Sequence, residues 1–93
     1  MRTLDYTGQF KLDYKREARG QHRNTLDAEL QLVLSRLMND QPLDPRHRDH
    51  GLTGDWSDHR DCHVRPDLVL IYQKPDVFTL RLILLGSHSE LGL

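Results

Sequence analysis

The chain has 93 residues, which is enough for one small domain and too few for two. Its formal net charge of −1 excludes a globally basic protein that holds nucleic acid by overall charge, and no apolar run reaches membrane-spanning length. The opening segment lacks the apolar core of a secretion signal, and a single cysteine is typical of a reducing compartment. We therefore expect one domain over residues 1–93, located in the cytoplasm.

The first segments predict a strand and a helix. The stretch "RTLDYT" alternates apolar and polar side chains, as a brief strand does. A helix is expected to start at Thr7 or Gly8, because Phe10 and Tyr14 are four residues apart among charged neighbours. Gly20 marks its expected end.

A second helix and a long loop follow. Asn24 or Thr25 is the candidate N-cap. The helical spacing predicts a buried stripe made of Leu26, Leu30, Val33, Leu34, Leu37 and Met38. Residues 39–55 contain two prolines and two glycines and predict a connecting loop, and loops of this length are often functional.

Three strands are expected in the second half, over residues 56–64, 67–73 and 77–85, with a tight turn at "KPD" between the last two. The order is then strand, helix, helix, strand, strand, strand. This order predicts an α+β fold in which two N-terminal helices pack on a mostly antiparallel sheet.

Alternation along residues 56–64 places two sets of side chains on opposite faces of the expected strand. The polar face carries His59, Asp61, His63 and Arg65. The other face carries Trp56, Cys62 and Val64, which we expect in the core. A buried thiol is inert, so Cys62 is not a candidate nucleophile.

A metal site is the first hypothesis for the histidines and aspartates. However, His59 and His63 would lie roughly 13 Å apart along a strand and could not bind one ion together. The sequence has no HExxH motif and no cysteine pair. We therefore expect neither a metal nor another cofactor.

Metal-free acid and base chemistry is the second hypothesis, because histidine titrates near neutral pH. Cleavage of RNA needs a base for the 2′-OH, an acid for the departing 5′-oxygen and cations for the phosphate. The residues that supply these types are His50, His63, Asp67 and His88, with Arg60 or Arg65. Taken singly, each is more often an ordinary surface residue, and their combination carries the hypothesis.

The stretch "DHGLTGDWSDHRDCHVRPDLVLIY" over residues 49–72 closely resembles the signature of the YafQ-type toxins of the RelE superfamily. The closing "GSHSEL", the opening "YTGQFKLDYK" and the chain length agree with the same family. The resemblance implies a RelE-like fold and a toxin of a bacterial type II toxin–antitoxin system. Such a toxin is a metal-independent endoribonuclease that cuts mRNA in the ribosomal A site.

The resemblance also implies the site and the partners. The family's catalytic positions fall on His50, His63, Asp67 and His88, and Asp61 also matches the motif. The expected contacts to RNA or phosphate are Arg60, Arg65, Asp61, Lys11, Lys15, Arg16 and Arg19. The expected partners are a cognate antitoxin, in a hetero-oligomer that binds operator DNA, and the 70S ribosome with its mRNA.

Two departures from the family pattern keep other functions open. The family usually has an arginine where this chain has Leu84 or Leu85, and an aromatic residue where it has Gly92. Each departure is expected to cost about 1–3 kcal/mol of phosphate stabilisation or base stacking. The alternative is a weakened RelE-fold protein that acts only as an antitoxin-binding corepressor module. Gyrase-poisoning relatives share the scaffold but lack the histidines, which argues against that class.

Overall fold

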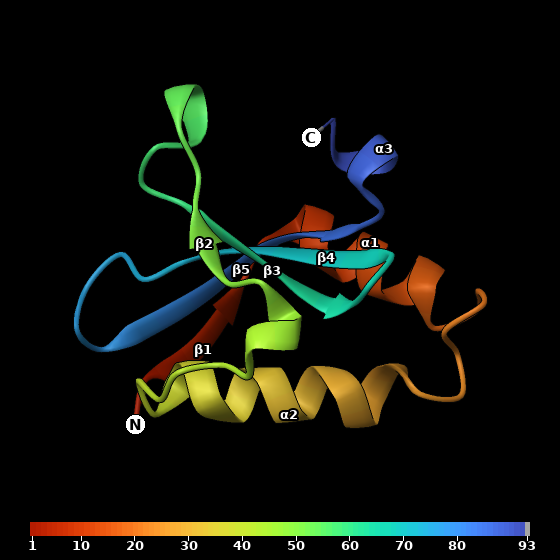
Figure 1. Ribbon diagram of the computed structural model, residues 1–93, viewed down its shortest axis with the longest axis horizontal. Coiled ribbons are helices and arrows are strands. Elements are labelled where there is room, and N and C mark those ends of the chain that lie inside the picture. The colour runs from red at the N-terminus through yellow and green to blue at the C-terminus, as the bar shows by residue number, and fades with distance from the viewer. Residues whose placement is uncertain (93) are drawn as a thin grey trace.

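The computed structural model describes residues 1–92 and shows a five-stranded sheet with helices (Figure 1). The strands are β1 (Thr3–Tyr6), β2 (His50–Gly51), β3 (Arg60–Arg65), β4 (Leu68–Gln73) and β5 (Thr79–Gly86). The α-helices are α1 (Gly8–Glu17), α2 (Leu26–Met38) and α3 (His88–Leu91), and two short 3-10 helices are η1 (Pro45–His47) and η2 (Gly54–Trp56). The α+β class is confirmed, and β2, α3 and the 3-10 helices are additions to the predicted elements.

The strand order in the sheet is β1-β5-β4-β3-β2. Only β1 and β5 pair in parallel, and the other three pairs are antiparallel. The parallel pair arises because the whole chain from α1 to β4 lies between these two strands, whereas β3, β4 and β5 are joined by short turns. The sheet is therefore mostly antiparallel, as predicted.

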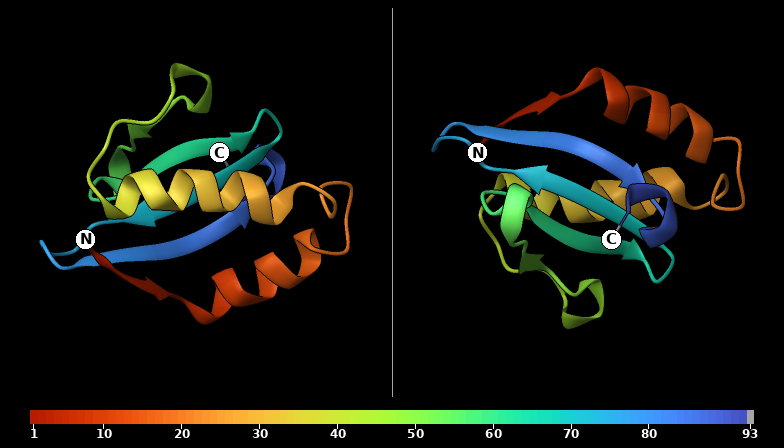
Figure 2. Two further views of the ribbon diagram at one scale, coloured as in Figure 1. Left: turned by 90° about the horizontal axis from the view of Figure 1, so that it is seen from below. Right: turned by 90° about the horizontal axis from the view of Figure 1, so that it is seen from above.

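The core lies between α2 and one face of the sheet. The predicted stripe of α2 is buried, except that Met38 is only partly buried against the core. It packs on the side chains of Cys62, Val64, Leu68, Leu70, Tyr72, Leu80, Leu82 and Leu85 from β3, β4 and β5. Viewed from below, α2 crosses this face of the sheet and α1 lies along the β1 edge (Figure 2). The opposite face is left for the site.

Local chemistry explains where α1 begins. Thr7 is its N-cap, and the Thr7 Oγ1 accepts a hydrogen bond from the Phe10 N–H at 3.0 Å. The same hydroxyl donates to the Ile83 carbonyl at 2.7 Å, which fixes the start of α1 against β5. The helix ends at Glu17, three residues before the predicted stop at Gly20. Thr25 occupies the N-cap position of α2, as predicted, without a side-chain capping bond.

The prediction of a strand from residue 56 was wrong over its first four residues. Because β3 pairs with β2 in antiparallel direction, the chain must reverse after Gly51 before β3 can begin. Residues 52–59 form this turn and include η2. Trp56 is consequently not in the core, and its ring lies against that of His59 at a centroid distance of 5.0 Å. Cys62 and Val64 are buried in the core, as predicted.

Arg65 was also predicted on the wrong face. The pairing of β3 with β4 shifts between His63 and Arg65, which is the signature of a bulge. Because of this shift, Arg65 no longer follows the alternation of Asp61 and His63, and its guanidinium lies 3.4 Å from Glu29 on α2. Within residues 1–92, no helix is both long enough and apolar enough to span a membrane.

Candidate active site

Two of the predicted catalytic histidines meet at the end of the sheet. His63 lies on β3, on the face turned away from α2, and His88 is the first residue of α3. Their rings contact edge to face at a centroid distance of 4.9 Å. His63 is 8% exposed whereas His88 is exposed. The pair therefore offers one sheltered imidazole and one that substrate can reach.

A capping box holds His88 in place. Ser87 is the N-cap of α3, and its hydroxyl accepts a hydrogen bond from the Glu90 N–H at 3.2 Å. In return, the Glu90 carboxylate accepts a hydrogen bond from the Ser87 N–H at 3.1 Å. This bond is the main reason why the pKa of Glu90 lies below its usual value. The motif "SHSE" thus fixes the first turn of α3, which carries His88.

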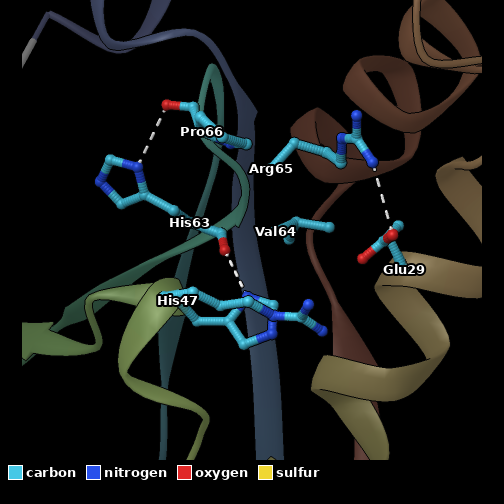
Figure 3. A pocket seen from close by; sticks show the side chains of 7 residues that line it. Glu29, His47, His63, Val64, Arg65 and Pro66 are labelled. Carbon is cyan, nitrogen blue, oxygen red and sulfur yellow. Dashed lines mark hydrogen bonds and ion pairs between the residues drawn. The ribbon is translucent and has the colours of Figure 1, made fainter.

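Two carbonyl contacts fix the position and the tautomer of His63 (Figure 3). The His63 Nδ1 lies 3.3 Å from the Pro66 carbonyl, which can only accept, so Nδ1 carries the proton in the neutral ring and Nε2 is the free base. The His63 carbonyl accepts a 2.7 Å hydrogen bond from Nδ1 of His47, a buried residue of η1. The strand backbone and the ring are therefore both restrained.

His50 and Asp61 form a second group on the same face. They are directly opposite in the β2–β3 pairing, and Asp61 is 2% exposed. The His50 Nδ1 donates to the Arg48 carbonyl at 2.8 Å and lies 3.1 Å from the Asp61 carboxylate. Because Asp61 and His63 are two residues apart on one strand face, the two groups are separated by about 7 Å along β3. The Arg48 carbonyl therefore orients the His50 ring, and the buried Asp61 carboxylate lies next to it without a hydrogen bond to its Oδ1 in the described part of the chain.

Asp67 is held away from the histidine pair. It lies in the turn between β3 and β4, and its carboxylate accepts a 2.8 Å hydrogen bond from the Gln21 side chain. The other carboxylate oxygen lies 3.1 Å from Nε2 of His22, which is 7% exposed. No hydrogen bond joins Asp67 to His63 or His88 within residues 1–92. The structure thus links Asp67 to the α1–α2 connection.

The basic residues predicted to contact RNA or phosphate lie in different parts of the structure. Arg60 donates to Asp49 at 3.2 Å and to the Tyr72 hydroxyl at 3.3 Å. Lys11 and Lys15 border an apolar groove between the helices, on the core side of the sheet. Arg19 is exposed on the turn after α1. None of these four lines either of the two cavities beside His63, in the part of the chain that the structure describes.

Arg16 serves the fold. Its guanidinium donates to the Leu85 carbonyl at 2.7 Å and lies 3.1 Å from Asp13 and 3.2 Å from Glu90. A Cβ at Gly86 would come within 3.0 Å of this guanidinium, so glycine is the residue that lets it pass. Arg16 therefore joins α1 to the end of β5 and to α3, the helix that begins with His88.

Cys62 and Tyr72 are buried titratable groups on β3 and β4. Burial raises the pKa of the Cys62 thiol far above its usual value, in keeping with the prediction that it is inert. Burial likewise raises the pKa of Tyr72, whose hydroxyl donates to Asp49 at 2.5 Å. Among residues 1–92, no group of three or more histidine, cysteine, aspartate or glutamate side chains could hold a metal ion.

Three contributors to the site were not predicted as such. His47 holds the His63 backbone, and Gln21 and His22 hold Asp67. His47 lies in "PRHRDH", a histidine-rich segment that could have drawn attention to it. Gln21 and His22 lie in a turn with no periodic pattern, and only the tertiary structure brings them to Asp67.

The sequence and the structure both match known toxins. The model of the family described as "Bacterial toxin of type II toxin-antitoxin system, YafQ" matches residues 2–92. The mRNA interferase toxin YafQ of Escherichia coli K12 is 36% identical over 91 residues, which cover 97% of this chain and 95% of that protein.

Solved structures agree. A copper-bound mutant toxin from Helicobacter pylori is 38% identical with a TM-score of 0.88, and the match covers 98% of this chain and 99% of that one. YafQ in its complex with DinJ from E. coli is 36% identical with a TM-score of 0.81, and covers 98% of both chains. The chain therefore belongs to the YafQ family of toxins of bacterial type II toxin–antitoxin systems.

Proposed function

We propose that this toxin is an mRNA interferase: a ribosome-dependent endoribonuclease that cuts mRNA in the A site by metal-independent acid–base catalysis. The observation that supports this most directly is the contact between the His63 and His88 rings at 4.9 Å. Family membership adds to it, because the E. coli relative is named as an mRNA interferase. Two imidazoles at one place supply the two proton transfers that RNA cleavage requires.

The proposed reaction is attack by the ribose 2′-oxygen on the adjacent phosphorus. One imidazole takes the 2′-OH proton, the new P–O bond forms, and the P–O bond to the 5′-oxygen breaks. The other imidazole donates a proton to that oxygen, which leaves a 2′,3′-cyclic phosphate. In the neutral tautomer that the Pro66 carbonyl favours, His63 presents a free Nε2 for one of these transfers.

The other site residues take supporting roles in this proposal. His50, with its ring oriented by the Arg48 carbonyl, supplies a third imidazole on β2, opposite Asp61, which lies about 7 Å from His63 along β3. Asp67 positions the turn whose Pro66 carbonyl orients His63. Arg60, Lys11, Lys15 and Arg19 are proposed to contact ribosomal or messenger RNA outside the cavities. Arg65 and Arg16, both engaged in internal ion pairs, are proposed to contribute charge to the RNA-facing surface.

The proposed partners follow from the same family. A cognate antitoxin is proposed to neutralise the toxin in a hetero-oligomer that binds operator DNA, since the E. coli relative forms a complex with DinJ. The ribosome and its mRNA are the proposed target, and the cytoplasm is the proposed location. No cofactor is required by this chemistry.

The test is cleavage of mRNA on purified programmed ribosomes, with the cut mapped relative to the A site. We expect wild-type cleavage to persist when the toxin alone is treated with EDTA and dialysed before the assay, with Mg²⁺ kept in the reaction for the ribosome. Cleavage should fall by about 10²-fold or more, the contribution of one general acid or base, in His63→Ala and His88→Ala. His59→Ala, which changes a histidine outside the pair, is the matched control. A treated toxin that cuts mRNA only after Zn²⁺ or another transition metal is added back would contradict the acid–base proposal.

A second candidate function is a weakened toxin that only binds its antitoxin. Two observations favour it. Leu84 pairs with Ile71, which in turn pairs with Asp61, so Leu84 lies in the same row of the sheet as Asp61. Its half-buried side chain is apolar and cannot stabilise a phosphate. Gly92 has a φ of 73° and ends α3 in a left-handed conformation that an aromatic residue would adopt at a cost. Growth arrest by the wild type but not by His88→Ala would exclude this candidate.

A further inference from the structure

The face beside His63 has two cavities that share a basic wall. The larger, about 240 Å³, lies between η1, α2 and the turn after β3, and Arg65 and Glu29 border it (Figure 3). The smaller, about 200 Å³, is lined by Arg46, Arg48, His63 and Pro66. Arg46, His63 and Pro66 line both. Each has room for several water molecules, or for a group of similar size.

The charge in these cavities is unbalanced. The smaller has two guanidinium groups and no carboxylate in its lining. The nearest carboxylates in the sequence are engaged elsewhere: Asp44 accepts from the Arg46 backbone N–H at 3.0 Å, and Asp49 accepts from Arg60 and Tyr72. Within residues 1–92, neither the Arg46 nor the Arg48 side chain makes a hydrogen bond or an ion pair. Exposed guanidinium groups beside a cavity favour an anion.

The larger cavity has an unsatisfied donor of its own. The Nε of Arg65 is buried and has no hydrogen-bond partner in the described part of the chain, although Nη1 of the same group pairs with Glu29. A buried N–H without an acceptor is unfavourable, so an acceptor oxygen that reached this group would be stabilised there. This donor is independent of Arg46 and Arg48, and it belongs to a residue that lines the same cavity as Arg46.

The two arginines are held at a fixed place relative to His63. They flank His47, which is buried and donates to the His63 carbonyl at 2.7 Å. Arg48 has a φ of 47° and a ψ of 45°, a left-handed conformation that is uncommon for a residue with a Cβ. The backbone on either side of His47 is thus tied to the strand that carries the candidate catalytic ring.

We propose that Arg46 and Arg48 form a phosphate-binding subsite that holds a backbone phosphate of single-stranded RNA next to the bond that is cut. Guanidinium groups bind phosphate oxygens through paired N–H donors, and such contacts position a strand without reading its sequence. The identity of the ligand rests on the proposed function. The binding of a phosphodiester at this place can be tested without cleavage.

The test measures binding of a fluorescein-labelled ten-nucleotide RNA with 2′-O-methyl groups, which cannot be cut, as a function of KCl concentration. The variants are Arg46→Gln, Arg48→Gly and the double variant. We expect the double variant to bind about tenfold more weakly, with a log–log salt slope lower by about 0.7 for each phosphate that is no longer neutralised. Glycine relieves the left-handed backbone at residue 48, so Arg48→Gly should unfold no earlier than wild type.

Lys74→Gln is the matched control. It removes one positive charge just after the end of β4, whereas the cavities lie beside the turn that precedes the start of β4. Its affinity and slope should stay at wild-type values. Equal weakening in Lys74→Gln and in the arginine variants, or no weakening in the double variant, would overturn the proposal.

Ribosome assays separate the two proposals. A wild type that binds the RNA through the arginines but never cuts mRNA contradicts the proposed function and leaves the subsite standing. A wild type that cuts, with a double variant unchanged in both KM and RNA affinity, contradicts the subsite and leaves the function standing.

Discussion

The position of His88 depends on the capping box of α3, and Ser87→Ala tests this dependence. The helix has four residues, far fewer than a helix needs to persist in isolation. Replacing an N-cap serine by alanine costs about 1 kcal/mol, which changes a local equilibrium by about fivefold. The first turn would then be folded for a smaller share of the time, and we expect the rate of mRNA cleavage to fall by at most about fivefold, the limit reached when the turn is mostly unfolded.

The assay pairs single-turnover cleavage on programmed ribosomes with proton NMR of the histidine rings. The His63 ring lies edge to face against that of His88, so fraying of α3 should move the His88 ring signals toward random-coil positions. Ser89→Ala makes the same chemical change two residues later, at an exposed residue, and should leave both readouts unchanged. Unchanged ring signals in Ser87→Ala would refute the reasoning, whatever the cleavage rate.

Three further predictions concern stability and activity. Asp13→Ala leaves the buried Leu85 N–H without the carboxylate that now accepts it at 3.0 Å, and should lower the free energy of unfolding in urea by about 1–3 kcal/mol. Hydrogen bonds from Lys74 and then Arg2 lower the pKa of Asp40 to about 2, so its contribution is present above about pH 4 and is lost as the pH falls toward 2. Asp40→Asn should therefore flatten the acid limb of a plot of melting temperature against pH, and an unchanged limb would contradict this. Leu84→Arg adds a cation to the site face and should raise the cleavage rate about tenfold on ribosomes; a decrease would show that the added charge does not reach the phosphate.

Much of the fold follows from local pattern. The stripe of α2, the alternation of Cys62 and Val64, and the apolar run of β4 each encode burial through spacing alone, and their burial was confirmed except at Met38, which is partly buried. The start of the strand at residue 56 was wrong because polar alternation in a turn looks like alternation in a strand. The prediction of the face on which Arg65 lies was wrong because a bulge adds one residue to the alternation, and no residue type in the sequence indicates this bulge.

The site divides in the same way. The motif in the sequence indicated the YafQ-type toxin family, which the family model and the E. coli relative confirmed, and it predicted His50, His63, Asp67 and His88 as the catalytic set, which stays a prediction. Only the tertiary structure decided their grouping: His63 with His88, His50 with Asp61, and Asp67 with the turn that follows α1.

The physical reason is sequence separation. A pattern records which side of its own helix or strand a residue occupies, whereas His63 and His88 lie 25 residues apart and meet only because β5 returns beside β4 and a capped turn follows it. The sequence likewise shows Arg46 and Arg48 only as part of a charged loop. Their position near His63 follows from the hydrogen bond between His47 and the His63 carbonyl. The sequence by itself determined which side chains are available, and the packing of the sheet decided which of them lie together.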